Sequence, residues 1–233
     1  MRLVVTIGNS NIKIGYSNGQ LKTMAFTKKE FKDYDWKKIG IYFSEILVAS
    51  VVPSFNNAVI QVLKENFRIE PKLITIDNIP IDTRQYDTSL LGVDRLLACF
   101  GALRYGTPCA VFDIGTAISI SVITEGHKFL GGAILPGIEM GIRSLNTNTA
   151  LLPKIDKINV KNVIGSDTAS CIASGIVFGT ASAVDGMATR IKTELGKSCK
   201  FILTGGGAYL ILPYCNINFE YNPHLIIEGM IRL

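Results

Sequence analysis

The feature that most constrains the fold of this chain is an internal repeat. The stretch LVVTIGNSNIKIGYSNG (Leu3 to Gly19) can be laid without a gap over AVFDIGTAISISVITEG (Ala110 to Gly126). In each copy an apolar segment leads into Ile-Gly, and an alternating segment and a second turn follow. An offset of about 107 residues is too long for a solenoid repeat, so the sequence predicts two duplicated domains that face each other across a cleft.

The segments after each copy predict the same order of elements in both halves: three strands, a helical region and a returning buried strand. The third strands are expected at 21–26 and 128–133, and the returning strands at 46–53 and 201–207. Long helices are expected at about 92–105 and 168–195. We place the domain boundary at Thr107-Pro108, which gives domains 1–107 and 108–233.

Composition excludes several classes of protein. Of the 233 residues 48% are hydrophobic, which predicts a folded globular chain. No uninterrupted apolar run approaches the roughly 18 to 20 residues of a membrane span, and no signal peptide is apparent, so a cytoplasmic protein is expected. The net charge is only +5, and the one lysine cluster (28–38) is interleaved with acidic residues. Neither a nucleic-acid patch nor a membrane surface is therefore expected.

The cysteines and histidines do not predict a metal site. The five cysteines have no Cys-x-x-Cys pair and lie among apolar neighbours, which predicts reduced core thiols. The two histidines, His127 and His224, lie far apart in the chain. A zinc site is not expected.

The turns that follow the duplicated strands suit phosphate oxygens. Glycine lets the backbone approach a ligand closely, and Asn, Ser or Thr add donors at the same turn. A third glycine cluster lies at Gly205-Gly206-Gly207. By pattern alone, nucleotide binding and ordinary tight hairpins are both open.

Nine motifs, taken in order and spacing, resemble the type III pantothenate kinase family from end to end. They are TIGNSNIK (6–13), VASVVP (48–53), LGVDR (91–95), DIGTA (113–117), GGAILPG (131–137), TALLP (149–153), IGSDT (164–168), SG (174–175) and LTGGG (203–207). The resemblance implies an α/β fold of two duplicated actin-like (ribonuclease H-like) domains, each a mixed sheet flanked by helices, with a nucleotide cleft between them. It also implies transfer of the γ-phosphoryl group of ATP, bound with Mg²⁺, to pantothenate at the entry to coenzyme A synthesis.

The resemblance implies a functional role only at positions where this chain carries the residue found in the family's motif. Asp94 takes the position of the general base, and Arg95 that of the group that binds the pantothenate carboxylate. An ordinary ion pair at a helix start is the alternative for both. The other residues implied to bind substrate are Gly92, Val93, Thr168 and Tyr86. Tyr86 lies one residue closer to Gly92 than is usual in the family.

The phosphate-binding residues carry over in the same way. The resemblance implies that the first loop binds ATP through Thr6, Ile7, Gly8, Asn9, Ser10, Asn11, Ile12 and Lys13, and the second through Thr116. Lys13 could equally be a solvated side chain. Asp113 matches the residue that holds a monovalent cation, K⁺ or NH₄⁺; a capped hairpin turn is its alternative.

The family forms homodimers, and in it Thr168 reaches a neighbouring subunit's site. A helix N-cap is the alternative role for Thr168. Gly175, Gly179 and Ala183 recur at a spacing of four, which permits either close contact with a second helix or packing on the chain's own sheet.

The chain departs from the family at two positions. Thr6 and Ser121 stand where relatives carry aspartates, and both changes remove negative charge from the expected cleft. Threonine has no charge to anchor hydrated Mg²⁺. A working kinase is favoured, with a weakened or inactive ligand-binding or regulatory relative as the alternative. No helix-turn-helix signature or basic stripe supports DNA binding, and the chain is too short for a filament-forming actin-like protein.

Overall fold

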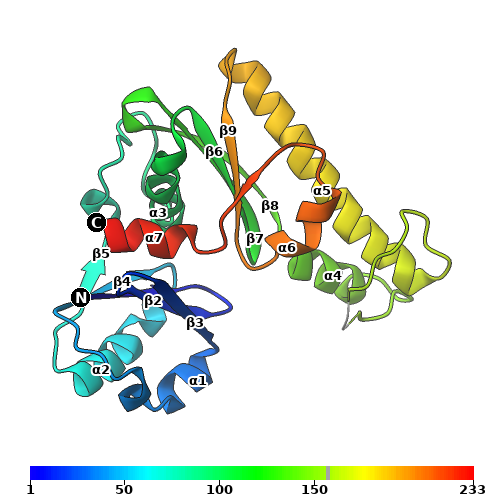
Figure 1. Ribbon diagram of the computed structural model, residues 1–233. Helices are drawn as coiled ribbons and strands as arrows, with labels where there is room; N and C mark the ends of the chain where they lie inside the picture. Colours follow the sequence, from blue (N-terminus) through cyan, green and yellow to red (C-terminus); the bar gives the residue numbers. More distant parts are fainter. Residues whose placement is uncertain (156–157) are drawn as a thin grey trace. The chain divides into compact units, whose positions relative to one another are not determined.

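The computed structural model describes residues 1–155 and 158–233, which divide into two compact units (Figure 1). The first unit combines Met1–Arg104 with His224–Leu233, and the second is Tyr105–Pro223. The chain passes from the first unit to the second between Arg104 and Tyr105, close to the domain boundary expected at residue 107. Residues 224–233, expected in the second domain, pack instead with the first, because α7 (Leu225–Arg232) lies against α3 (Val93–Ala102) and β1 (Arg2–Ile7).

The first unit is built on a mixed five-stranded sheet with the strand order β3-β2-β1-β4-β5. β1 pairs antiparallel with β2 (Ile12–Ser17), and β2 pairs antiparallel with β3 (Leu21–Phe26). On its other side β1 pairs parallel with β4 (Glu45–Ser50), which continues to β5 (Lys72–Ile74). The strand expected at 46–53 ends at Ser50, since Pro53 begins a 3₁₀ turn.

Helices cover both faces of this sheet. Alternate residues of β1, Leu3, Val5 and Ile7, form a core with α1 (Lys28–Asp33) and α2 (Asn56–Phe67). The opposite face of β1 and β2 carries α7, where the Ile227 side chain lies against Gly15. Figure 1 shows α1 and α2 below this sheet, and α3 with α7 above it. The two faces therefore have different partners, and the α3–α7 face is the one on which Thr6 lies.

The second unit repeats this topology, with the strand order β10-β9-β6-β7-β8. β6 (Cys109–Ile114), β7 (Ala117–Thr124) and β8 (Lys128–Pro136) are antiparallel, and β6 pairs parallel with β9 (Lys200–Thr204), which meets β10 (Glu220–Tyr221). The predicted duplication into two mixed sheets flanked by helices is thus confirmed.

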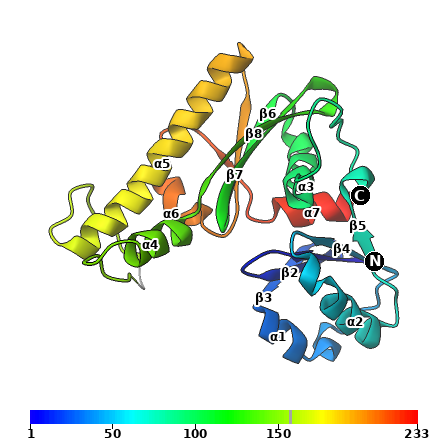
Figure 2. The same cartoon turned by 180° about the vertical axis from the view of Figure 1, so that it is seen from behind.

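One face of the second sheet is covered by α4 (Ile138–Thr147), α5 (Thr168–Leu195) and α6 (Ala208–Ile211), as Figure 2 shows for α4 and α5. Phe112, Ile114 and Ile120 of the sheet pack there against Val184 and Ala188 of α5. Asp185 accepts hydrogen bonds from the backbone N–H groups of Asn216 (2.7 Å) and Ile217 (3.1 Å). This carboxylate ties α5 to the segment that precedes β10. The helix spans the range that the sequence predicted.

α5 is also long and apolar enough, by length and composition, to cross a membrane. No uninterrupted apolar run reveals this property in the sequence, because α5 is rich in Ala, Gly, Ser and Thr. A single helix of this kind is weak evidence for a span, since a core helix passes the same test. The residues of α5 that pack on the sheet give it a role in the core.

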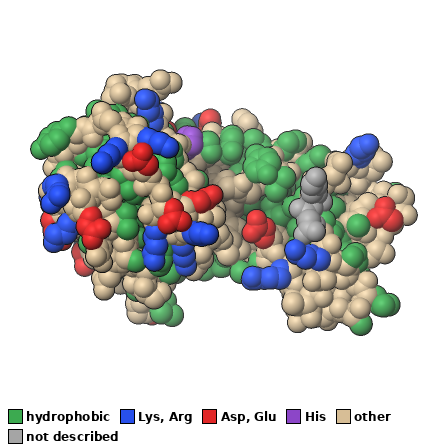
Figure 3. All heavy atoms as spheres, turned by 90° about the horizontal axis from the view of Figure 1, so that it is seen from below, with side chains coloured by type: hydrophobic (Ala, Val, Ile, Leu, Met, Phe, Trp, Pro, Cys, Tyr) green, Lys and Arg blue, Asp and Glu red, His purple; other side chains and the backbone are tan. Residues whose placement is uncertain are grey.

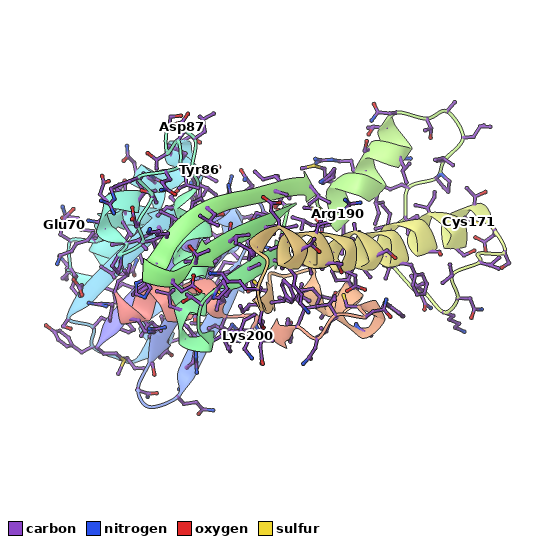
Figure 4. All side chains as sticks on the ribbon, turned by 90° about the horizontal axis from the view of Figure 1, so that it is seen from above. Glu70, Tyr86, Asp87, Cys171, Arg190 and Lys200 are labelled. Carbon is purple, nitrogen blue, oxygen red and sulfur yellow. The ribbon has the colours of Figure 1, made fainter. Side chains whose placement is uncertain are left out.

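The cysteines only partly match the expectation of core thiols. All five are free; Cys99 and Cys109 are buried, but Cys171 is exposed on the first turn of α5, as Figure 4 shows. Burial raises the pKa of the Cys109 thiol to about 12. A thiol that is protonated at neutral pH is a poor nucleophile, so this side chain is a packing group.

The lysine-rich segment lies on α1 and the 3₁₀ turn Trp36–Ile39, where Phe31 and Trp36 are buried. Thr27 and Glu30 form a capping box at the start of α1. Figure 3 looks onto the α1–α2 side of the first unit and shows basic and acidic side chains interspersed. This surface is not a continuous basic patch.

Candidate functional site

The first candidate site element is the turn that joins β1 to β2 at residues 8–11. Its ends are closed by a hydrogen bond from the Gly8 N–H to the Asn11 carbonyl (3.0 Å). Asn9, Ser10 and Asn11 are exposed, whereas the neighbouring Ile7 and Ile12 side chains are buried in the core. Of the expected ATP-binding residues, these two isoleucines can therefore offer only backbone groups.

Strand register places Thr6 directly opposite Lys13 across the β1–β2 pair. Opposite residues of an antiparallel pair point to the same face of the sheet, and both side chains are half-buried there. In the second unit the residue opposite Asp113 is Ser119. The gapless overlay of the two copies is wrong beyond the turn, because residues 8–11 form a longer connection than residues 115–116 and shift the register of the second strand.

Asp113 lies at the end of β6, beside the glycine cluster that follows β9. Gly205 has φ +93°, and a Cβ placed on it would lie 2.3 Å from Asp113 Oδ1 and 2.6 Å from the backbone N and O of Ile114. The Gly207 N–H donates to the Ile114 carbonyl (2.8 Å). Glycine is required at 205 by both the backbone angle and the space. The Gly205 turn therefore packs directly against Asp113 and Ile114.

The exposed Thr116 lies in the short turn between β6 and β7, and the start of α4 packs onto that turn. A Cβ on Gly137, the N-cap of α4, would lie 2.2 Å from the Thr116 carbonyl and 2.4 Å from the Gly115 carbonyl. The Gly115 N–H donates to the Ala117 carbonyl (3.1 Å). The second unit therefore brings Asp113, Thr116 and the Gly205 turn to one end of β6.

Ser121, the second departure from the family pattern, lies elsewhere in the strand. It is only 2% exposed and pairs with Val111 on β6 and Gly132 on β8, in the middle of the sheet. Ser121 is thus not at the strand end that carries the turn.

Asp94 belongs to the first turn of α3, which begins after its N-cap Gly92. Asp94 Oδ1 accepts a hydrogen bond from the Arg95 N–H (2.8 Å). Desolvation by burial raises the pKa of Asp94, and this effect outweighs the backbone hydrogen bond and the nearby Arg95 charge, which lower it. A carboxylate with a raised pKa is better matched to accepting a proton near neutral pH.

Arg95 and Tyr86 come together in the same unit. Arg95 Nη1 donates to the Tyr86 hydroxyl at 3.4 Å. Figure 4 labels Tyr86 on the loop that precedes α3. The Val93 side chain is buried (7% exposed) and anchors the helix start, so it can offer a ligand only its backbone. Although Tyr86 lies one residue closer to Gly92 than is usual in the family, its hydroxyl contacts Arg95, so the two side chains lie side by side.

The start of α3 lies near the end of β4. A Cβ on Gly92 would be 3.6 Å from Val51 Cγ1, and the Val51 N–H donates to the Ile7 carbonyl at 3.0 Å. Asp94 and the turn at residues 8–11 therefore lie at the same carboxyl edge of the first sheet. The VASVVP motif contained Val51, but its sequence gave no indication that this residue links the two.

Thr168 is the first residue of α5 and is exposed. The N-cap is Asp167, whose side chain accepts from the Ser170 N–H (2.8 Å) in a capping box. The alternative role of Thr168 as the N-cap is therefore wrong. The sequence does carry a signal for Asp167, because Asp is a preferred N-cap residue and stands one position before Thr168.

Among the residues that the structure describes, no group of three or more His, Cys, Asp or Glu side chains could hold a metal ion. Mg²⁺ keeps several waters and is often bound through one or two carboxylates plus substrate phosphates. These residues therefore fit a divalent ion that arrives with a polyphosphate better than one held in a protein cage.

Comparison with known proteins shows which family this chain resembles. The family model described as type III pantothenate kinase matches residues 2–190. A type III pantothenate kinase of Persephonella marina is 33% identical over 246 residues, covering 99% of this chain and 96% of the relative. That of Kosmotoga olearia is 36% identical over 228 residues, covering 89% and 85%.

Solved structures agree on the fold. A Campylobacter jejuni protein assigned to a Baf family of transcriptional activators has a TM-score of 0.66 at 21% identity, covering 99% of this chain and 96% of its own. A ROK family glucokinase of Streptomyces griseus, in complex with glucose and AMPPNP, has a TM-score of 0.54 at 12% identity, covering 99% and 98%. At these identities the likeness concerns the fold alone.

The Gly205 turn provides a test of this site's construction. We expect Gly205→Ala to lower the free energy of unfolding by about 2 kcal/mol or more, since it adds a strained φ to a contact with the Ile114 backbone. Gly206→Ala is the matched control, because a Cβ there meets nothing within 4 Å. Denaturant unfolding of both variants would measure the difference, and equal stabilities would contradict the described packing.

Proposed function

The chain belongs to the type III pantothenate kinase family, and from this membership we propose which of its residues carry out each part of the reaction. It transfers the γ-phosphoryl group of ATP to the primary hydroxyl of pantothenate, which gives 4′-phosphopantothenate, the first step of coenzyme A biosynthesis. ATP is used with a divalent metal ion. The enzyme is a phosphotransferase to an alcohol group.

Asp94 is the general base in this proposal. A neutral alcohol attacks phosphorus poorly, and a carboxylate within hydrogen-bond reach can accept its proton as the new O–P bond forms. The observation that carries this assignment is the half-buried position of Asp94 on the first turn of α3, where desolvation raises its pKa. The bond to the leaving ADP breaks as the bond to the pantothenate oxygen forms.

Arg95 and Tyr86 bind the acceptor. The guanidinium group suits the pantothenate carboxylate, because its fixed fork of donors matches two carboxylate oxygens. The Tyr86 hydroxyl, 3.4 Å from Arg95 Nη1, orients that fork and contributes an aromatic wall. Gly92 and Val93 contribute backbone groups at the helix start.

The nucleotide phosphates bind the turn of residues 8–11 with Thr6 and Lys13, and Thr116 donates its hydroxyl to ATP. Mg²⁺ would travel with the ATP phosphates and supply charge neutralisation there. Asp113 would hold a monovalent cation, K⁺ or NH₄⁺; its carboxylate lies at the end of β6, where Gly205 packs against it. A regulatory relative without turnover is not favoured by any observation on this chain.

The enzyme is a cytoplasmic homodimer in this proposal, with α5 at the interface. A Cβ on Gly175, Gly179 or Gly186 would meet nothing within 4 Å, so one face of α5 offers a smooth strip for close helix approach. The exposed Thr168 at the start of α5 would contact the acceptor in the partner subunit's site.

The Asp94→Asn variant tests the base. We expect kcat to fall by about 10²- to 10⁴-fold with little change in KM for pantothenate, since the amide cannot accept the proton. Pantothenate-dependent ADP release with ATP, Mg²⁺ and K⁺ measures this. A variant with near wild-type turnover would exclude Asp94 as the base.

Stability against pH provides a second readout for Asp94. Because its pKa is raised in the folded state, the stabilising contribution of protonated Asp94 is present below its unfolded pKa and is lost as pH rises through the folded pKa. Asp94→Asn should therefore gain stability relative to the wild type between acid and neutral pH. Thermal unfolding of the wild type and of Asp94→Asn, at an acid pH and at neutral pH, measures this difference in stability. A relative loss of stability by Asp94→Asn towards neutral pH would contradict the description of a buried carboxylate.

The Asp113→Asn variant tests the monovalent cation. We expect its kcat/KM to fall at least about tenfold in K⁺ and to become the same in K⁺ and Na⁺, because the amide attracts a cation weakly. Ser119→Ala, on the strand opposite Asp113, is the control and should keep its preference for K⁺. A K⁺ preference that survives in Asp113→Asn would remove Asp113 from this role.

The Gly179→Leu variant tests the dimer. Leucine should favour the helix by about 1 kcal/mol while blocking close approach, so we expect a folded monomer with greatly reduced turnover. Lys192→Leu, at an exposed position on another face of α5, should remain dimeric. Sedimentation velocity distinguishes the two, and a dimeric Gly179→Leu would exclude this face as the interface.

A further inference from the structure

The two hairpins of this chain are equivalent in topology, but each carries a single charge of opposite sign at the pair of facing residues where its first strand ends. In the second unit the end of β6 presents the Asp113 carboxylate opposite the Ser119 hydroxyl. In the first unit the end of β1 presents the neutral Thr6 opposite the Lys13 ammonium. One hairpin therefore suits a cation, and the other suits an anion.

We propose that the β1–β2 hairpin is a metal-independent polyphosphate subsite, in which Lys13 neutralises the phosphates of a nucleoside di- or triphosphate without a divalent ion. This inference rests on the proposed function, because it assigns a ligand to the same nucleotide site. It goes beyond that function by assigning the two ligands to different hairpins: the first hairpin binds the polyphosphate directly, and the second receives the cation.

The Lys13 ammonium is available for a ligand. Within residues 1–155 and 158–233, it forms no ion pair or hydrogen bond with another side chain, and the side chain is half-buried beside Thr6. Burial of part of the lysine stem limits its freedom, so less rotamer entropy is lost when the ammonium contacts a phosphate. The other cross-strand neighbour of Lys13 is Ala25 on β3, which is also neutral.

The surroundings of Lys13 suit phosphate oxygens. The turn at residues 8–11 begins two residues after Thr6, beyond Ile7, and exposes the side chains of Asn9, Ser10 and Asn11. The Thr6 hydroxyl can donate to a phosphate oxygen, whereas a carboxylate at that position would repel metal-free ATP and would need a bridging cation. The Thr6–Lys13 pair therefore removes the need for that cation in binding, although the chemical step can still use it.

The inference is tested by titrating ATP and ADP into the full-length protein by calorimetry, once with Mg²⁺ and once with EDTA. We expect the wild-type Kd for ATP in EDTA to lie within about tenfold of that in Mg²⁺. Lys13→Met should weaken binding in EDTA by about 10- to 100-fold, the usual range for the loss of one charged hydrogen bond. No detectable binding by the wild type in EDTA would overturn the inference.

Two further variants separate the role of Lys13 from general charge. Thr6→Asp should weaken binding in EDTA at least about tenfold and regain it in Mg²⁺, because the carboxylate repels bare phosphates but binds a hydrated metal ion. Lys22→Met, an exposed lysine on β3, makes the same change in net charge and should alter Kd less than about twofold. Equal losses in Lys13→Met and Lys22→Met would show a non-specific charge effect and overturn the proposal.

Lys13→Arg should restore most of the binding in EDTA, which a purely structural role for the lysine stem would not predict. Binding and turnover also distinguish the two proposals. Absence of pantothenate-dependent ADP release, with ATP binding in EDTA intact, would contradict the kinase mechanism and leave this inference standing. Turnover in Mg²⁺ without any ATP binding in EDTA would support the kinase mechanism and contradict this inference.

Discussion

The parallel pairing of each hairpin's first strand with a strand from much later in the chain is the constraint on which the rest of this structure depends. β1 pairs with β4 over its whole length, and β6 pairs with β9. Parallel neighbours end at the same edge of a sheet, so the turns that follow them collect there. This pairing brings the start of α3 beside the turn of residues 8–11 and brings the Gly205 turn beside Asp113.

Much of the fold could be predicted from the sequence because hydrophobic periodicity and turn residues are local signals. The third strand at 21–26 and the long helix at 168–195 lie where the pattern places them. Register could not be predicted in the same way, because it depends on how many residues each turn uses. The gapless overlay consequently aligned Lys13 with Ile120, whereas strand pairing makes Ser119 its counterpart.

The candidate site likewise combines features that local sequence patterns predict with features that they do not. Glycine motifs and the resemblance to a family indicated Asp94, Arg95 and Asp113, since these residues are recognisable by type and spacing. The contact between Arg95 and Tyr86, the N-cap role of Asp167 and the packing of Gly137 on the Thr116 turn are long-range or geometric facts. Each depends on where backbones meet in space, which no local pattern encodes.

The position of α7 has a consequence for the synthesis of this protein. α7 packs on α3 and β1, Arg2 Nη1 donates to the Ile231 carbonyl (3.1 Å), and Arg104 pairs with Glu228 (2.9 Å). The first unit is therefore incomplete until residues 224–233 have left the ribosome, whereas Tyr105–Pro223 is one continuous stretch of chain. Although residues 1–104 are translated first, the first unit can finish folding only after the whole second unit has been made, when His224–Leu233 complete it.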